Sequence, residues 1–328
     1  MLFSSAAFLF AADVIFAGDY LTSPTAADLT AGGVGLVKYL QPTVSGRPDS
    51  ALFGMVRDNG TRFHEGIDLK SVSRDENGIP QDVVVAVADG IVAHVCPVDN
   101  GSYGKYVVIV HNSSGIEFYS LYAHLAEVSC DLKEHEFISA GKRIGTIGNT
   151  SNTYKIPLSN AHLHFEIGMM LGRDGFDSWY ASKYKEGNLH GHYNGLNLVG
   201  ADPLKFFDMA RAKKPAINAL SWINAQECAF TVEIPYSGVP DILFRSPALR
   251  ENRQVPKEIK SWEVNFTWFG MPIRFIPRDY SVSGVGIKNA SEKFIDLAER
   301  RGMLLRTSNK ELQAGLNLRN YLRIIFNY

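Results

Sequence analysis

Two short histidine-containing segments hold the residue types that bind a catalytic metal ion. The first is His64-Glu65-Gly66-Ile67-Asp68 and the second, about a hundred residues later, is His162-Leu163-His164-Phe165-Glu166. Residues two or four apart in a strand share a face, so His64 and Asp68 are expected to point together, as are His162 and His164. Imidazole and carboxylate are zinc ligands, and three protein ligands with one open position are typical of catalytic zinc.

A third segment, Leu121-Tyr122-Ala123-His124-Leu125, adds another histidine between these two. The chain has 9 histidines, so chance can produce one such pair. Three segments in this order and local context form a much stronger signal. They predict a metal-dependent hydrolytic site built on strands.

The residues around these histidines resemble the lysostaphin-type (LytM-like) zinc metalloendopeptidases, peptidoglycan peptidases with a duplicated hybrid motif. The resemblance is carried by Phe-His-Glu-Gly-Ile-Asp-Leu at 63–69, Tyr-Ala-His-Leu at 122–125 and His-Leu-His-Phe-Glu at 162–166. Connecting segments at 85–92, 104–111 and 141–150 agree with it, and it covers roughly residues 40–207. One segment departs: the family usually has a Thr-Gly-Pro turn before this second histidine pair, whereas residues 155–161 read Lys-Ile-Pro-Leu-Ser-Asn-Ala.

The resemblance implies one Zn²⁺ per chain held by His64, Asp68 and His164, with His124 and His162 as the catalytic histidines. One of these two would accept the proton of the attacking water and the other would stabilise the oxyanion; the residues leave the order open. The implied activity is hydrolysis of peptidoglycan peptide cross-links. The acidic peptidase half favours a D,D-endopeptidase over a glycyl-glycine type. The alternative is a non-hydrolytic wall-binding regulator that activates other wall hydrolases.

Other polar residues near these segments receive weaker interpretations. Glu65 and Glu166 are expected to alternate away from the ligand face and to play supporting or surface roles. His190 and His192 lie in a segment rich in glycine and asparagine, and they are weak candidates for substrate contact.

The elements that must position these residues are short strands. Apolar β-branched and aromatic runs at 83–87, 91–95, 106–110, 117–122 and 163–167 are separated by Gly- and Asn-containing turns. This spacing is typical of all-β architecture, so we expect a mainly β, antiparallel core of the duplicated hybrid (barrel-sandwich) type. Residues 171–200 are expected to form a loop. An additional α+β C-terminal region should follow, with helices at 206–212, 216–225, 293–301 and 310–325 and strands at 228–234 and 262–276.

Charge and motif together suggest three parts: 1–39, the peptidase domain at 40–207, and a basic C-terminal domain at 208–328 whose role the sequence leaves open. Residues 1–204 hold 14 lysines and arginines against 22 aspartates and glutamates, whereas residues 205–328 hold 19 against 12. The basic half predicts attraction to an anionic wall or membrane surface, and we expect no nucleic-acid partner.

The N-terminal residues 1–17 are mostly apolar and indicate a signal peptide, with an N-terminal strand or helix packed on the core as the alternative. A periplasmic, cell-envelope or secreted location follows from the signal peptide and the implied substrate. No apolar run reaches the 18 residues or more that a membrane helix needs. The three cysteines fit no metal motif; buried free thiols are favoured over a bridge between Cys96 and Cys130.

Overall fold

The structure, a computed structural model, describes residues 21–29, 34–213, 217–251 and 256–328. The expected signal peptide lies outside these residues. Every pairing between named strands of the described residues is antiparallel, which confirms the expected mainly β fold with an additional α+β region. None of the described helices combines the length and apolarity needed to cross a bilayer.

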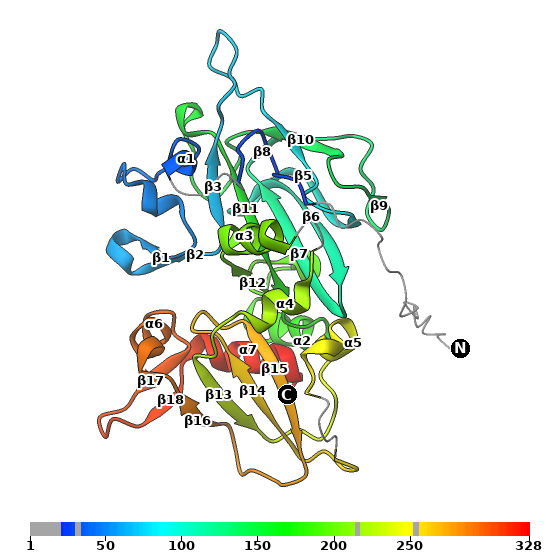
Figure 1. Cartoon of the computed structure of the whole chain (residues 1–328), viewed down its shortest axis with the longest axis vertical. Helices are drawn as coiled ribbons and strands as arrows, with labels where there is room; N and C mark the ends of the chain where they lie inside the picture. The colour runs from blue at the N-terminus through cyan, green and yellow to red at the C-terminus, as the bar shows by residue number, and fades with distance from the viewer. Residues whose placement is uncertain (1–20, 30–33, 214–216, 252–255) are drawn as a thin grey trace.

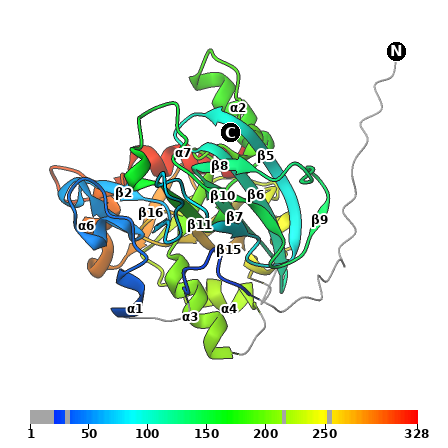
Figure 2. The same cartoon turned by 90° about the horizontal axis from the view of Figure 1, so that it is seen from above.

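The main sheet carries most of the expected site. Its strands lie in the order β12 (Leu198–Ala201), β11 (His162–Met170), β7 (Ile116–Ala123), β6 (Gly104–Ser113), β5 (Gly90–Asn100) and β9 (Phe137–Ile138). β3 (Ile67–Lys70) shares one edge of β11 with β12, pairing with the first half of that strand. The long strands curl, as the view from above shows (Figure 2).

Two smaller sheets flank the main one. β4 (Val83–Val85), β10 (Arg143–Ile147) and β8 (Leu125–Val128) form the first, and the second is the hairpin of β1 (Gly54–Arg57) and β2 (Arg62–His64). The alternation in β11 separates two environments: Leu163, Phe165 and Ile167 enter the apolar core, and the polar residues between them point to the other face. This alternation is what the sequence pattern of β11 predicted.

The C-terminal region forms a second layer below the peptidase sheets (Figure 1). Its four-stranded sheet has the order β15 (Pro272–Arg278), β14 (Ser261–Phe266), β13 (Phe230–Ile234) and β16 (Gly286–Ala290), and a small hairpin pairs β17 (Leu304–Arg306) with β18 (Leu312–Ala314). Helices α3 (Pro203–Lys213) and α4 (Ala219–Asn224) connect the layers; α5 (Ile242–Arg245), α6 (Ile295–Arg300) and α7 (Leu316–Phe326) follow. One apolar cluster includes residues of both layers, so they share a core.

The C-terminal residues pack directly against the hairpin that carries His64. Phe63 of β2 contacts the ring of Trp268 with 5.7 Å between ring centroids, and the guanidinium carbon of Arg301 lies 4.0 Å from the Phe63 centroid. Farther away, Arg245, whose side chain is 9% exposed, donates to a Glu117 carboxylate oxygen at 2.8 Å. The C-terminal layer therefore supports the strand on which part of the site is built.

Three expectations about elements were wrong in part. The expected loop at 171–200 contains the helix α2 (Asp174–Lys183), which forms because Phe176 and Trp179 are buried where α2 packs against α7. The expected helix at 310–325 is divided into β18 and α7, and the expected strand at 262–276 is divided into β14 and β15 by a turn in which Gly270 has a left-handed φ of +98°. All three cysteines are free, but only Cys96 is buried.

The expectation that His64 and Asp68 come from one strand was also wrong. The chain bends at Glu65-Gly66 and divides the segment into β2 and β3, so the two side chains converge because of the bend. A Cβ atom on Gly66 would overlap the carbonyl oxygen of Phe165 on β11. The glycine in this motif is therefore required by the close approach of two backbones.

We expect Gly66→Ala to lower the free energy of unfolding by about 1–3 kcal/mol, because the added methyl group must push β11 away. The measurement is the denaturant concentration at the midpoint of unfolding. The dependence of the free energy of unfolding on denaturant concentration should be the same in the variant and the parent. Gly187→Ala is the matched control, since its added Cβ would meet no atom within 4 Å. Equal midpoints for the two variants would contradict the packing argument.

Candidate metal centre

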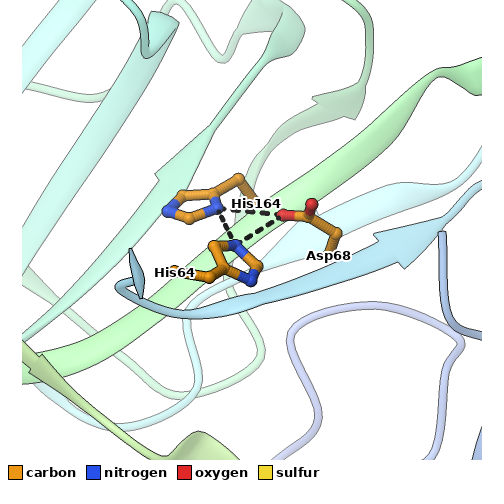
Figure 3. Close-up of side chains that lie close together, drawn as sticks. All are labelled: His64, Asp68 and His164. Atoms are coloured by element: carbon orange, nitrogen blue, oxygen red, sulfur yellow. Dashed lines mark hydrogen bonds and ion pairs between the residues drawn. The ribbon is translucent and has the colours of Figure 1, made fainter. Parts of the chain in front are cut away.

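Three side chains from the three strands β2, β3 and β11 converge on one point (Figure 3). His64 Nε2 lies 3.1 Å from Asp68 Oδ1 and 3.1 Å from His164 Nδ1, and the last two atoms are 2.9 Å apart. The register places His164 directly opposite Asp68, so both point to the same face. The structure thus brings together the three residues that the sequence suggested as ligands.

Hydrogen bonds fix which ring nitrogen of each histidine presents its lone pair. His64 Nδ1 donates to the Leu52 carbonyl at 2.8 Å, which leaves Nε2 facing the centre. His164 Nε2 donates to Glu166 Oε1 at 2.9 Å, which leaves Nδ1 facing it. An acceptor behind each imidazole is the arrangement that orients metal-binding histidines in proteins.

Glu166 is therefore not turned away from the ligand face, as the sequence analysis supposed. It lies two residues after His164 on β11, and residues two apart in a strand share a face. Its other contacts are hydroxyl donors: Tyr103 at 2.9 Å and Tyr119 at 2.6 Å. Burial opposes the charge of Glu166, but the hydrogen bonds from His164 and the tyrosines lower its pKa, so it is a carboxylate.

Arg57, at the end of β1, is a polar neighbour that the sequence analysis missed. Its Nη2 atom lies 2.9 Å from His64 Nε2 and also donates to Asp68 Oδ2. Its side chain is only 13 % exposed. No motif spacing marks this arginine, because it reaches the centre from a separate strand across the hairpin.

His124 and His162 lie next to the three-residue group. Their ring centroids are 4.8 Å apart, and His162 Nε2 is 3.8 Å from Asp68 Oδ1. His124 occupies the corner between β7 and β8 with a left-handed φ of +62°, a conformation that is costly for a residue with a side chain and is found more often at functional sites.

The same two histidines are neutral bases. His124 Nδ1 donates to the Thr150 carbonyl and His162 Nδ1 to the Asn160 carbonyl, each at 2.8 Å, so both Nε2 atoms keep their lone pairs. Burial lowers the pKa of both imidazoles, and the neighbouring histidines lower that of His124 further. Each can accept a proton at neutral pH.

His190 and His192 lie elsewhere. His190 Nδ1 is 2.7 Å from the hydroxyl of Tyr106, and the rings of Tyr106 and Tyr103 connect it with His164. His192 Nε2 is 3.0 Å from a carboxylate oxygen of Asp177. The structure places neither in the three-residue group, and their role in substrate contact stays a prediction.

The donor set fits a zinc ion. A tetrahedral zinc with bonds near 2.0–2.1 Å keeps its ligand atoms about 3.3 Å apart, close to the separations of 2.9–3.1 Å found here. The centre also attracts positive charge: burial lowers the pKa of His164, but hydrogen bonds to Asp68 and Glu166 together raise it to about 9, so Nδ1 carries a proton at neutral pH that a metal ion would have to displace. Within the described residues, this is the one group of three or more such side chains arranged to hold a metal ion.

Comparison with known proteins identifies the domain around this centre. Residues 62–174 match Peptidase family M23, which confirms the resemblance of this part of the chain to the LytM-like peptidases. The matched segment contains His64, Asp68, His124, His162 and His164, and it ends before His190. Residues 62–174, which include the suggested site, are therefore similar to the M23 peptidases.

Several solved structures are similar to parts of this chain. A zinc-containing peptidase from Vibrio cholerae is 24% identical over 46% of this chain and 33% of its own, with a TM-score of 0.25. The catalytic domain of lysostaphin from Staphylococcus simulans is 23% identical over 36% of this chain and 74% of its own, with a TM-score of 0.25. Csd3 from Helicobacter pylori is 23% identical over 45% of this chain and 29% of its own, with a TM-score of 0.28. The match thus spans about a third of the Vibrio and Helicobacter chains. No curated protein matches the chain significantly.

We expect Glu166→Gln to weaken zinc binding about 10- to 100-fold, because the amide no longer provides a charged acceptor behind His164. The measurement is competition with a chromogenic chelator. Glu65→Gln is the matched control, since Glu65 also adjoins a suggested ligand but lies 3.6 Å from Arg301 and is 37% exposed. Identical affinities for the two variants would show that Glu166 does not orient His164 for a metal.

Proposed function

We propose that this chain is a zinc-dependent endopeptidase that hydrolyses peptide cross-links of peptidoglycan. The observation that carries the proposal is the convergence of three lone pairs, from His64, Asp68 and His164, beside two neutral histidines. The match to Peptidase family M23 supports the same conclusion. Because the substrate is outside the cytoplasm, we place the protein in the periplasm or cell envelope.

His64, Asp68 and His164 would hold one zinc ion, which when bound supplies a water of lowered pKa and polarises the scissile carbonyl. His124 and His162 would carry out the proton transfers. Each has a free Nε2 that accepts a proton, and each has an Nδ1–H that donates to a backbone carbonyl, which stabilises the imidazolium after proton transfer. Their equivalent tautomers allow either residue to act as the base, and the other can donate to the developing oxyanion only in its protonated form, in which Nε2 also carries a hydrogen.

The experiment that tests the proposal is digestion of purified sacculi by the full-length protein with added zinc, followed by mass analysis of the released fragments. Cleavage between D-alanine and diaminopimelate supports the D,D-endopeptidase type. Fragments cut within glycine bridges would support the other type. Binding to sacculi without release of fragments would instead support a non-hydrolytic regulator.

The suggested ligands and catalytic histidines should respond differently to alanine substitution. We expect His64→Ala and Asp68→Ala to lose both zinc and hydrolysis, because two ligands hold the ion poorly against a chelator. We expect His124→Ala to retain zinc and to lose about 10²–10⁴-fold in kcat, the usual contribution of general acid–base catalysis. Zinc content by mass spectrometry and turnover on soluble muropeptides provide the two measurements.

His162→Ala belongs in the second class and serves as the comparison for His124→Ala. The roles proposed here fail if either variant loses zinc in parallel with activity, since that residue would then be a ligand. They also fail if His64→Ala retains a full equivalent of zinc.

We further propose that the basic C-terminal half attracts the chain to an anionic wall or membrane surface. Arg300, Arg319 and Arg323 form no ion pair within the described residues, so their charges are available to a polymer. Deleting residues 208–328 is a poor test, because they share the core that supports β2.

We therefore expect the triple variant Arg300→Gln, Arg319→Gln, Arg323→Gln to pellet less with sacculi at low salt while keeping its turnover on small soluble substrates. The difference should disappear at high salt, because exposed charges are screened over about 8 Å at physiological ionic strength. If the triple variant pellets as much as the parent at low salt, these arginines do not contribute to attraction to the sacculi.

A further inference from the structure

A groove of about 600 Å³ is lined by residues from three segments of the chain, one of which begins at Lys70, two residues after Asp68 on β3. Its lining contains three cationic side chains, Lys38, Lys70 and Arg74, and no acidic one. The other lining residues are Tyr39, Gln41, Ser71, Val72 and Ser159. This composition contrasts with the acidic character of residues 1–204, which hold 14 basic against 22 acidic residues.

The strand register places the groove on the ligand face. Lys70 pairs with His162 on β11, one step along from the pair of Asp68 with His164. Paired residues of antiparallel strands point to the same side, so Lys70 shares a face with the suggested metal ligands. On the other edge of β3, Leu40 bridges to Leu69, and Lys70 N donates to the Tyr39 carbonyl. The segment that contains Lys38 and Tyr39 therefore lies next to β3, on the edge of this strand that faces away from β11.

The cations of the groove are not neutralised by acidic partners within the part of the chain that the structure describes. The Lys38 ammonium lies 4.7 Å from the centroid of the Tyr39 ring, and the half-buried Lys70 has no ion-pair partner there. Arg74 donates to backbone carbonyls, including Gly78 at 2.8 Å and Leu158 at 2.9 Å. The groove thus keeps a net positive potential.

Arg74 also contacts the segment 155–161, which departs from the family pattern. Ser159 of the segment 155–161 lines the groove, and Arg74 holds this segment through the carbonyls of Leu158, Ser159 and Ala161. Asp82, which accepts from Ser71 Oγ at 2.6 Å and from two backbone amides, is buried behind the groove. The charge of Asp82 is therefore stabilised by these hydrogen bonds within the protein.

We propose that Lys38 and Lys70 bind a carboxylate of the peptide substrate, close to the bond that is cut; this inference rests on the proposed function. Residues two apart in a strand are separated by about 6.6–7 Å, which is the distance from Asp68 to Lys70 along β3. An extended peptide covers that distance in about two residues. A D-alanyl-diaminopimelate cross-link carries a carboxyl group next to the scissile amide, whereas a glycine bridge carries none. The groove therefore selects anionic cross-links.

The test compares two fluorescein-labelled cross-linked peptides that differ only in the diaminopimelate carboxyl group, free in one and amidated in the other. Binding is measured by fluorescence anisotropy with the full-length, zinc-loaded His124→Ala chain, in which cleavage is slow. We expect the free carboxylate to bind about tenfold more tightly, and the double substitution Lys38→Gln, Lys70→Gln to abolish this preference while leaving the affinity for the amidated peptide unchanged.

Lys133→Gln is the matched control, because Lys133 is an exposed lysine of the same domain that pairs with Glu136 away from this groove. Thermal unfolding checks that the double variant is folded. Equal affinity for both peptides, or a preference that survives the double substitution, overturns the inference. Hydrolysis of sacculi by the parent chain is judged separately: a parent that prefers the carboxylate but cuts nothing refutes the proposed function and leaves the carboxylate site standing.

Discussion

The pairing of β3 with the first half of β11 is the constraint on which the centre depends. Its register sets His164 opposite Asp68 and His162 opposite Lys70, so one face holds two suggested ligands, a catalytic histidine and a cation. Because side chains alternate along a strand, a slip of β11 by one residue would send His162 and His164 into the apolar core, and a slip of β3 would do the same to Asp68 and Lys70. Leu163 and Phe165 oppose such a slip, since they would be moved out of that core.

The remaining ligand depends on support from distant sequence. His64 ends β2, and the neighbouring Phe63 packs among Phe53, Trp268 and Phe269, with Arg301 over its face. The C-terminal layer thereby holds the hairpin against the main sheet. For this reason the basic region contributes to the geometry of the centre as well as to the surface charge, and the two effects must be separated by surface substitutions.

Local patterns were sufficient to predict most strands of the peptidase part, whereas the set of residues that converge was predicted from the resemblance to a known family. The alternation in β11 identifies its two faces, and the His-x-His pair lies on one of them. Other features needed tertiary information. Arg57 reaches the centre from a separate strand, Lys70 resembles an ordinary solvated lysine, and α2 is stabilised by burial of Phe176 and Trp179 at α7. A single-sequence pattern contains no signal for contacts of this kind.

The position of Arg57 has a consequence for how Asp68 would bind a metal. Its guanidinium donates to Asp68 Oδ2, while Asp68 Oδ1 faces both His64 and His164. The carboxylate is thus divided between two roles, with one oxygen toward the centre and the other toward the arginine. Arg57 also donates to His64 Nε2, whose single lone pair serves either a hydrogen bond or a metal ion. For His64 to hold a metal ion, its Nε2 lone pair would have to be free of the contact with Arg57, whereas the contact of Arg57 with Asp68 Oδ2 could remain.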